Sequence, residues 1–205
     1  MDKLESRLDK SLRNRIDKAH MSWSDFSEPA FEIVVFGSRA AGMNRRLSDL
    51  DVLVVGAGAK RVKRFGLDLI CISVADLTSS SWLNSELAGH ISKYGVWLKG
   101  GGDWTTKVRI GKAAERQKQR RLVSLVRSVK HSWSKLHPSF QLKYRVSIRR
   151  ELQRLLLLQN AIPIPPTSML DTEWNGAKAE RQALLRVSDP IFNDPEGFIV
   201  KIVLA

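Results

Sequence analysis

The sequence predicts an α+β protein in which a half built of strands and helices is followed by a helical half. Short apolar runs in the first half, such as Phe31–Phe36, are typical of buried strands. In the second half, apolar residues recur every three or four positions, which is typical of helices that bury one face. Three consecutive glycines, residues 100–102, lie between the two patterns. We therefore expect one domain over residues 1–102 and a second region over residues 103–205.

The first half is expected to begin with an amphipathic helix, because apolar residues recur at every fourth position from Leu4 to Ile16. The elements expected next are a strand at 31–36, a helix over 39–46, strands at 51–55 and 67–72, a helix over 81–94 and a strand at 96–99. The basic segment Lys60–Arg64 lies between two of these strands. It either reaches a triphosphate or an acceptor, or forms an exposed hairpin tip.

The second half is expected to contain two long helices. The first is centred on an apolar stripe that includes Leu122, Val126 and Val129. The second begins at Pro138 and runs to Asn160, where a proline-rich segment ends it. A third helix is expected over 177–187, and the apolar segment 198–204 fits either a strand or a helix.

Two aspartates mark the most informative stretch of the chain. Asp49 and Asp51 lie at the start of the apolar run Val52–Val55. Residues i and i+2 of a strand point to the same face, so both carboxylates project side by side. Their mutual repulsion is relieved by a divalent cation with oxygen ligands, and we expect Mg²⁺, or Mn²⁺ in its place.

A Gly-Ser turn at Gly37 and Ser38 follows the first strand and is expected to bind phosphate. The glycine lets the backbone bend and approach a ligand, while the serine offers a hydroxyl and a backbone N–H. A helix that starts near Arg39 would direct its free N–H groups to the same place. Arg39, Arg45 and Arg46 add positive charge. Together with the aspartates, these residues indicate a site for a metal-bound nucleoside triphosphate.

This stretch resembles the polymerase-β-like nucleotidyltransferase superfamily, in particular its small prokaryotic members, including those of toxin–antitoxin pairs. The family pattern is Gly-Ser, a spacer, and Asp-x-Asp at the head of a strand, which Gly37-Ser38 and Asp49-Leu50-Asp51 match. A third carboxylate is needed on a neighbouring strand, and Asp68 supplies it. The resemblance covers residues 1–100 and implies a mixed sheet flanked by helices.

The resemblance also implies a two-metal mechanism. Asp49 and Asp51 would hold one metal on the phosphate oxygens and share a second with Asp68, which is the candidate base. The nucleoside triphosphate is the substrate, bound by Gly37, Ser38, Arg39 and Arg46, and pyrophosphate is the leaving group.

Positive charge is concentrated in the second half. The chain carries a net charge of +13, and residues 107–154 hold 15 Lys and Arg against two acids. Such a segment is expected to bind a polyanion, although a solvated helix face has the same composition. The candidate nucleic-acid-binding residues are Arg116, Arg120, Arg127, Arg145 and Arg149.

The acceptor is left open by the sequence. The favoured acceptor is RNA, such as a tRNA end, because of the basic segment. The alternative is transfer of AMP or another nucleoside monophosphate to a partner protein in a toxin–antitoxin pair, and an acidic face on that partner would equally explain the basic segment. Antibiotic modification is disfavoured because an aminoglycoside is itself a polycation, and a non-catalytic nucleotide- or RNA-binding module is the remaining possibility.

The composition excludes several other classes of protein. No apolar run is long enough to span a membrane, and the charged N-terminus lacks a signal-peptide core. Cys71 is the only cysteine, so no internal disulfide can form. We therefore expect a cytoplasmic protein without membrane contacts.

Overall fold

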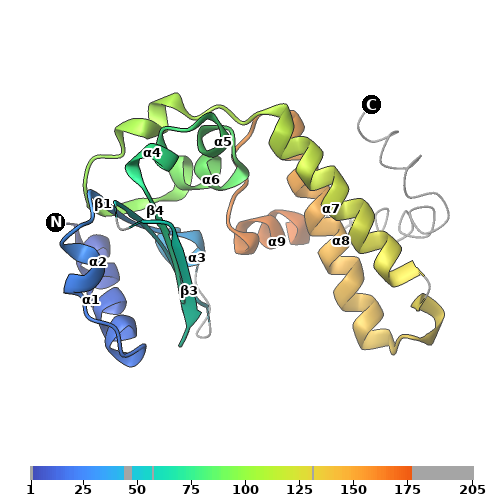
Figure 1. Cartoon of the computed structure of the whole chain (residues 1–205). Helices are drawn as coiled ribbons and strands as arrows, with labels where there is room; N and C mark the ends of the chain where they lie inside the picture. Colours follow the sequence, from blue (N-terminus) through green and yellow to red (C-terminus); the bar gives the residue numbers. More distant parts are fainter. Residues whose placement is uncertain (1, 44–47, 57, 131, 177–205) are drawn as a thin grey trace. The chain divides into compact units, whose positions relative to one another are not determined.

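The computed structural model describes residues 2–43, 48–56, 58–130 and 132–176 (Figure 1). The chain divides between Arg109 and Ile110 into two compact units.

A five-stranded mixed sheet forms the centre of the first unit. Its strands are β1 (Glu32–Phe36), β2 (Leu50–Val55), β3 (Lys60–Arg64), β4 (Leu67–Ile72) and β5 (Val96–Lys99). They are arranged in the order β3-β4-β2-β1-β5. The β2–β4 pair is parallel and the other pairs are antiparallel. The predicted fold class and the four predicted strands are confirmed.

The two faces of the sheet are covered by different helices. One face packs against α1 (Lys3–Lys18), which was predicted from its apolar repeat. The opposite face packs against α6 (Glu86–Tyr94) and includes Leu53 and Val55. Because alternate residues of a strand share a face, Asp51 lies on the α6 side.

Short helices connect these elements: α2 (Ser24–Ser27), α3 (Gly37–Ala40), α4 (Val74–Leu77), α5 (Ser80–Leu83) and the 3₁₀ helix η1 (Asp103–Lys107). The helix expected over 81–94 is interrupted. Ser85 caps α6 by accepting a hydrogen bond from the backbone N–H of Ala88 at 3.0 Å, which starts a new helix there. The start predicted for the helix over 39–46 is also wrong, because α3 begins at Gly37 and is a single turn. Residues 44–47 lie outside the described residues.

The basic segment that forms β3 was not predicted as a strand. Charged side chains occupy four of its five positions, and it pairs with β4 at an edge of the sheet. Edge strands tolerate such charges, which also discourage pairing with another chain. Phe65 and Gly66 close the β3–β4 hairpin with φ of 50° and 72°. Positive φ at both positions is characteristic of a type I′ turn.

The described part of the second unit is helical. It contains α7 (Lys112–Lys130), the 3₁₀ helix η2 (Trp133–Lys135), α8 (Pro138–Gln159) and α9 (Thr167–Gly176). The helices α7 and α8 pack along the predicted stripe, and both are confirmed. The helix α9 was not predicted, while the predictions for 177–187 and 198–204 lie outside the described residues. Within the described chain, no helix is long and apolar enough to cross a membrane.

Candidate active site

Two of the predicted aspartates lie side by side on adjacent parallel strands. Asp51 on β2 and Asp68 on β4 are direct partners in the strand register. Partners in a register share a face, so both carboxylates project to the α6 side of the sheet. Asp49 precedes β2 by one residue. The structure thus places Asp51 and Asp68 side by side, with Asp49 at the start of the same strand as Asp51.

Gly37 is required next to Asp51 for a steric reason. Phe36 is the register partner of Asp51, so the Gly-Ser turn begins beside that aspartate. A Cβ added to Gly37 would overlap the Oδ2 atom of Asp51. Its φ of 74° is also a left-handed conformation that disfavours other residues. The backbone N–H of Gly37 donates to Nε2 of His90 at 3.2 Å, which ties the turn to α6.

The Gly-Ser turn leaves a hydroxyl for a ligand. Ser38 is half-buried in α3, and its side chain makes no hydrogen bond with the described residues. Arg39, predicted to bind nucleotide, donates from Nε and Nη2 to the carbonyl of Ser48 at 3.0 and 2.8 Å. It therefore holds the residue that precedes Asp49. Arg46 lies outside the described residues.

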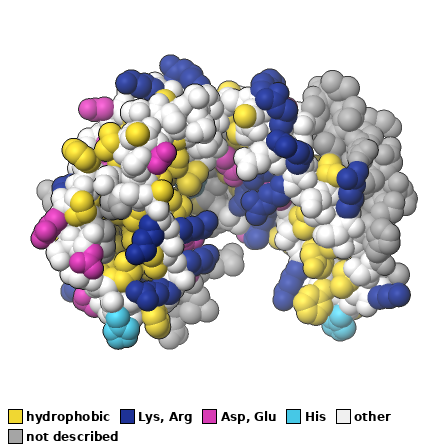
Figure 2. Space-filling model, in the orientation of Figure 1, with side chains coloured by type: hydrophobic (Ala, Val, Ile, Leu, Met, Phe, Trp, Pro, Cys, Tyr) yellow, Lys and Arg dark blue, Asp and Glu magenta, His cyan; other side chains and the backbone are white. Residues whose placement is uncertain are grey.

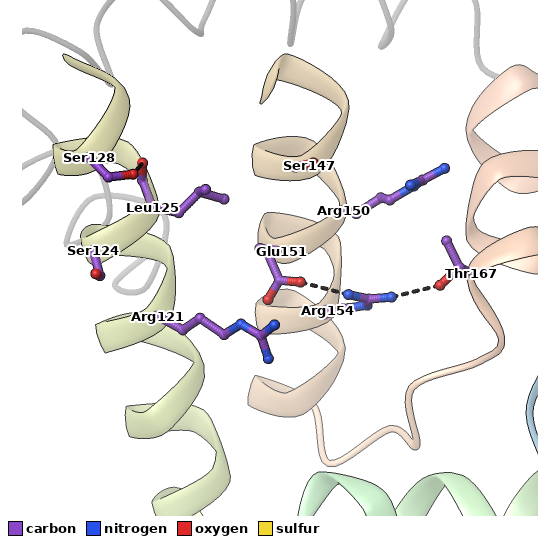
Figure 3. A pocket seen from close by; sticks show the side chains of 9 residues that line it. All are labelled: Arg121, Ser124, Leu125, Ser128, Ser147, Arg150, Glu151, Arg154 and Thr167. Carbon is purple, nitrogen blue, oxygen red and sulfur yellow. Dashed lines mark hydrogen bonds and ion pairs between the residues drawn. The ribbon is translucent and has the colours of Figure 1, made fainter. Parts of the chain in front are cut away.

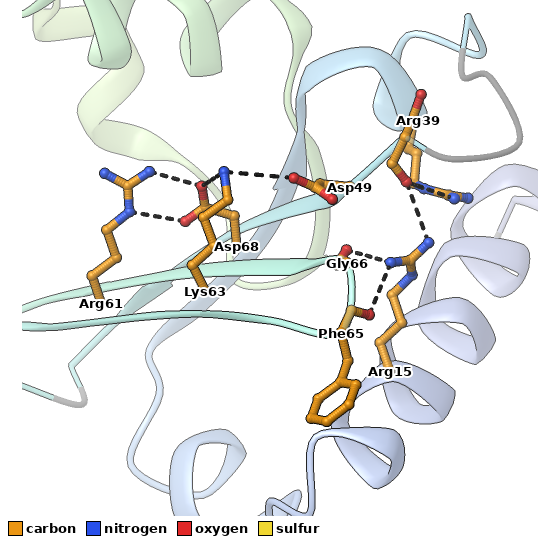
Figure 4. Close-up of polar contacts among 9 residues, drawn as sticks. Arg15, Arg39, Asp49, Arg61, Lys63, Phe65, Gly66 and Asp68 are labelled. Atoms are coloured by element: carbon orange, nitrogen blue, oxygen red, sulfur yellow. Dashed lines mark hydrogen bonds and ion pairs between the residues drawn. The ribbon is translucent and has the colours of Figure 1, made fainter.

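A second arginine reaches the same carbonyl from α1 (Figure 4). Arg15 donates to the carbonyls of Ser48 at 3.3 Å, of Phe65 at 3.4 Å and of Gly66. These carbonyls belong to the segments that lead into β2 and β4. Arg15 thus joins the segments that carry Asp49 and Asp68, a role that no sequence pattern revealed.

Two basic side chains of β3 contact the carboxylates (Figure 4). Arg61 donates to both oxygens of Asp68, with Nε–Oδ1 and Nη2–Oδ2 distances of 2.9 and 2.7 Å. Lys63 lies between two carboxylates, with its Nζ 3.5 Å from Oδ2 of Asp68 and 3.6 Å from Oδ2 of Asp49. The hydrogen bond from Arg61 lowers the pKa of Asp68, despite burial. Asp68 is therefore ionised and neutralised by the protein's own cations.

Asp51 has the opposite electrostatic environment. Its burial, with the negative charges of Asp68 and Asp49 nearby, raises the pKa of Asp51 to about 6. The cations Lys63 and Arg61 offset only part of this effect. At Asp51, the effect of burial and of the neighbouring negative charges therefore exceeds the effect of the two β3 cations.

These residues fit a divalent cation in their chemistry. Carboxylate oxygens are the ligands that Mg²⁺ prefers, and the Lys63 ammonium already stands as a cation between two of the carboxylates. In the described part of the chain, no three His, Cys, Asp or Glu side chains are gathered closely enough to hold a metal. Arg61 also occupies both oxygens of Asp68. A metal would have to displace this guanidinium.

The predicted nucleic-acid-binding arginines are not alike in the structure. Arg116, Arg120 and Arg127 are exposed on α7. Arg145 on α8 lies over the Trp133 ring, 5.3 Å from its centroid. Arg149 is only 12% exposed and pairs with Asp171. On the face drawn in Figure 2, Lys and Arg side chains lie on both units.

Comparison with known proteins identifies the region around the carboxylates. Residues 21–94 match the family described as "Nucleotidyltransferase domain", and this range includes the Gly-Ser turn and all three aspartates. The chain carries a polymerase-β-like nucleotidyltransferase domain. No curated protein matches the chain.

Solved structures give weaker likenesses to the nucleotidyltransferase domain and the rest of the chain. A toxin–antitoxin complex with AMP-PNP is 18% identical, covers 57% of this chain and 96% of its own, and has a TM-score of 0.30. A nucleotidyltransferase-like protein from Exiguobacterium sibiricum 255-15 is 12% identical, with 93% and 70% coverage and a TM-score of 0.39. A mutant MntA–HpeT toxin–antitoxin complex is 16% identical, with 61% and 97% coverage and a TM-score of 0.29. The domain assignment rests on the family match and the site.

Proposed function

We propose that the chain is a metal-dependent nucleotidyltransferase that transfers a nucleoside monophosphate from a nucleoside triphosphate to an acceptor hydroxyl. The observation that carries this proposal is the register pairing of Asp51 with Asp68, with Asp49 and the Gly37-Ser38 turn beside them. Asp49, Asp51 and Asp68 are the residues that would hold the metal. When bound there, a divalent metal polarises the phosphate oxygens and lowers the pKa of the acceptor hydroxyl.

The chain's own residues then have distinct roles in the proposed reaction. Ser38 donates its hydroxyl to a phosphate oxygen, and Gly37 lets that phosphate approach the backbone. Asp68, freed from Arg61, accepts the proton of the acceptor hydroxyl. Arg61 and Lys63 then lie close enough to neutralise the charge of the triphosphate and of the departing pyrophosphate.

The acceptor that we propose is a hydroxyl on a partner protein, as in a toxin–antitoxin pair. The basic segment was the main argument for RNA, and part of its charge is used within the second unit. Lys118 and Arg154 pair with Glu151, while Arg149 and Arg150 pair with Asp171. A cation held in an internal ion pair contributes less to a polyanion-binding surface.

RNA is the second candidate, because Arg116 and Arg120 remain exposed on α7. One experiment separates the two acceptors. The protein is incubated in a lysate with Mg²⁺ and each of the four α-labelled nucleoside triphosphates. The labelled products are then treated with either RNase or protease. A label that survives RNase and is lost with protease supports a protein acceptor, and the reverse pattern supports RNA.

The Asp51→Asn and Asp68→Asn variants serve as controls for the transfer reaction. Each should abolish labelling, because each removes a charged oxygen from the metal site. A variant that labels as well as the unchanged protein would contradict the assignment of the active site.

A further inference from the structure

A cavity of about 560 Å³ lies within the second unit, between α7, α8 and the start of α9 (Figure 3). Its lining is cationic and rich in hydroxyl groups. Three arginines, Arg121, Arg150 and Arg154, line it together with one carboxylate, that of Glu151. Three serines and Thr167 complete its polar lining. This volume is in the range of cavities that bind small molecules.

The single lining carboxylate does not balance the three guanidinium groups. Glu151 already pairs with Lys118, with Oε2 3.0 Å from Nζ, and with Arg154, with Oε1 2.6 Å from Nη1. Although burial opposes it, these two cations lower the pKa of Glu151, so the carboxylate is ionised and already paired. The lining of the cavity therefore keeps an excess of positive charge.

Two of the arginines are held in place by the protein. Arg154 donates from Nη2 to Oγ1 of Thr167 at 2.7 Å as well as to Glu151. Arg150 donates from Nε to Oδ1 of Asp171 at 2.9 Å, and from Nη2 to Oδ2. Ordered guanidinium groups bind an anion with a smaller loss of conformational entropy.

Donors on three residues at the cavity are unused by the described residues. Nε of Arg154 is buried and has no hydrogen-bond partner. Arg121 forms no ion pair with the described residues, and its guanidinium is directed from α7 toward Glu151 on α8 (Figure 3). Ser124, one turn further along α7, likewise makes no side-chain hydrogen bond with described residues. A buried donor without a partner costs free energy, which an anionic ligand would recover.

We propose that this cavity binds the phosphate group of a small phosphorylated molecule. Arg121 and Ser124 contact the phosphate from α7, and Arg154 contacts it from α8. Guanidinium groups and hydroxyls are the side chains that recognise phosphate best. The site is separate from the carboxylate site, since all of its residues belong to the second unit. The proposal does not depend on nucleotidyl transfer.

The test uses the full chain in EDTA, with inorganic phosphate, pyrophosphate and glycerol phosphate as probes in titration calorimetry at constant ionic strength. We expect saturable binding with one site per chain. Tighter binding of glycerol phosphate than of inorganic phosphate identifies a phosphate ester as the ligand, and the reverse identifies the free anion. Arg121→Gln should weaken binding at least roughly ten-fold, because it removes a charge-assisted hydrogen bond.

Matched variants separate this site from other cationic surfaces. Arg116→Gln changes an exposed arginine of α7 that does not line the cavity, and it should leave phosphate affinity unchanged. Asp51→Asn should also leave it unchanged. Absence of saturable binding at millimolar phosphate, or an equal loss in Arg116→Gln, would overturn the proposal. The proposal would also be overturned if an oligonucleotide displaced pyrophosphate and this displacement depended on Arg121, because the surface would then bind nucleic acid.

Discussion

Asp51 carries its charge in an unfavourable environment, and this has a measurable consequence for stability. Its pKa of about 6 in the folded chain is higher than the ordinary value of 3.8. The folded state therefore binds a proton more tightly, and stability falls as the pH rises from about 4 to about 6. At pH 7 the full cost is about 3 kcal/mol. We predict that Asp51→Asn raises the Tm of the metal-free protein at pH 7 by several degrees, measured by circular dichroism.

The same comparison at pH 4 provides the internal control for Asp51. At pH 4 the carboxyl is protonated in the folded state and close to half-protonated in the unfolded state, so most of the gain from asparagine should disappear. Asp103→Asn, at an exposed carboxylate, should give no gain at pH 7. A gain for Asp51→Asn that is equal at both pH values would show that its charge is not the cause.

Arg61 is expected to compete with metal for Asp68. Its guanidinium occupies both carboxylate oxygens, but its side chain is 63% exposed, so the pair is screened by solvent. We predict that Arg61→Ala tightens Mn²⁺ binding without nucleotide by roughly five-fold, equivalent to about 1 kcal/mol. Titration of the Mn²⁺ electron paramagnetic resonance signal measures this affinity.

Arg64→Ala is the matched control for Arg61. It removes an exposed arginine from the same strand, but from the opposite face, because residues 61 and 63 alternate with residue 64. Its Mn²⁺ affinity should equal that of the unchanged chain. Equal effects of the two substitutions would point to general surface charge instead of competition at Asp68.

At the level of single residues, the sequence predicted acids better than bases. The sequence identified Asp49, Asp51 and Asp68 because each lies in or next to an apolar strand. A carboxylate there is costly unless it is paired or binds a metal. Arg15 could not be found, because it contacts Gly66 across 51 positions through a backbone carbonyl, which leaves no pattern. Arg61 was visible only as part of a basic segment. Its role depends on β3, which was not predicted because its charged residues do not form an apolar run.

At the level of elements, burial decided what could be predicted. The strands β1, β2 and β4 are apolar runs buried on both faces of the sheet, so composition alone marks them. The edge strand β3 has one neighbour and mostly exposed side chains, so it lacks that signal. The α5–α6 break depends on Ser85 as a helix cap within an otherwise helical pattern.

The packing of α7 against α8 includes a buried ion pair. The side chains of Lys118 and Glu151 are 3% and 9% exposed, with Nζ 3.0 Å from Oε2. Removing one partner leaves a buried charge that is less well compensated. We predict that Lys118→Ala lowers the free energy of unfolding of the second unit by about 3 kcal/mol, measured by urea denaturation.

Lys112→Ala tests whether that loss is due to burial. Lys112 pairs with Glu115 on the same helix at the same 3.0 Å distance, but its side chain is 78% exposed. Its removal should cost less than the removal of Lys118, because the Lys112 ammonium is exposed and screened by solvent, although Glu115 itself is only 10% exposed. Similar costs for the two lysines would contradict a special role for the buried pair.

At the level of the whole molecule, each unit has its own hydrophobic cores. The two clusters around the sheet contain only residues of the first unit, and the two clusters around α7, α8 and α9 contain only residues of the second. The carboxylate site draws only on the first unit, and the cationic cavity only on the second. Metal affinity and phosphate affinity should therefore respond to separate sets of substitutions.

Separate cores predict that the first unit folds without the second. A fragment of residues 1–109 keeps every described residue of the two sheet clusters, together with Asp49, Asp51 and Asp68. We expect it to unfold cooperatively in urea and to bind Mn²⁺ with the affinity of the full chain, since no metal-site contact is removed.

A fragment of residues 1–99 is the matched control. It lacks Trp104, whose indole N–H donates to Glu32 on β1 at 3.0 Å and whose side chain is buried in the α6 core. The shorter fragment should therefore be less stable by about 3 kcal/mol or more. If the 1–109 fragment proved unfolded while the full chain remained cooperative, the second unit would have to supply part of the sheet's stability.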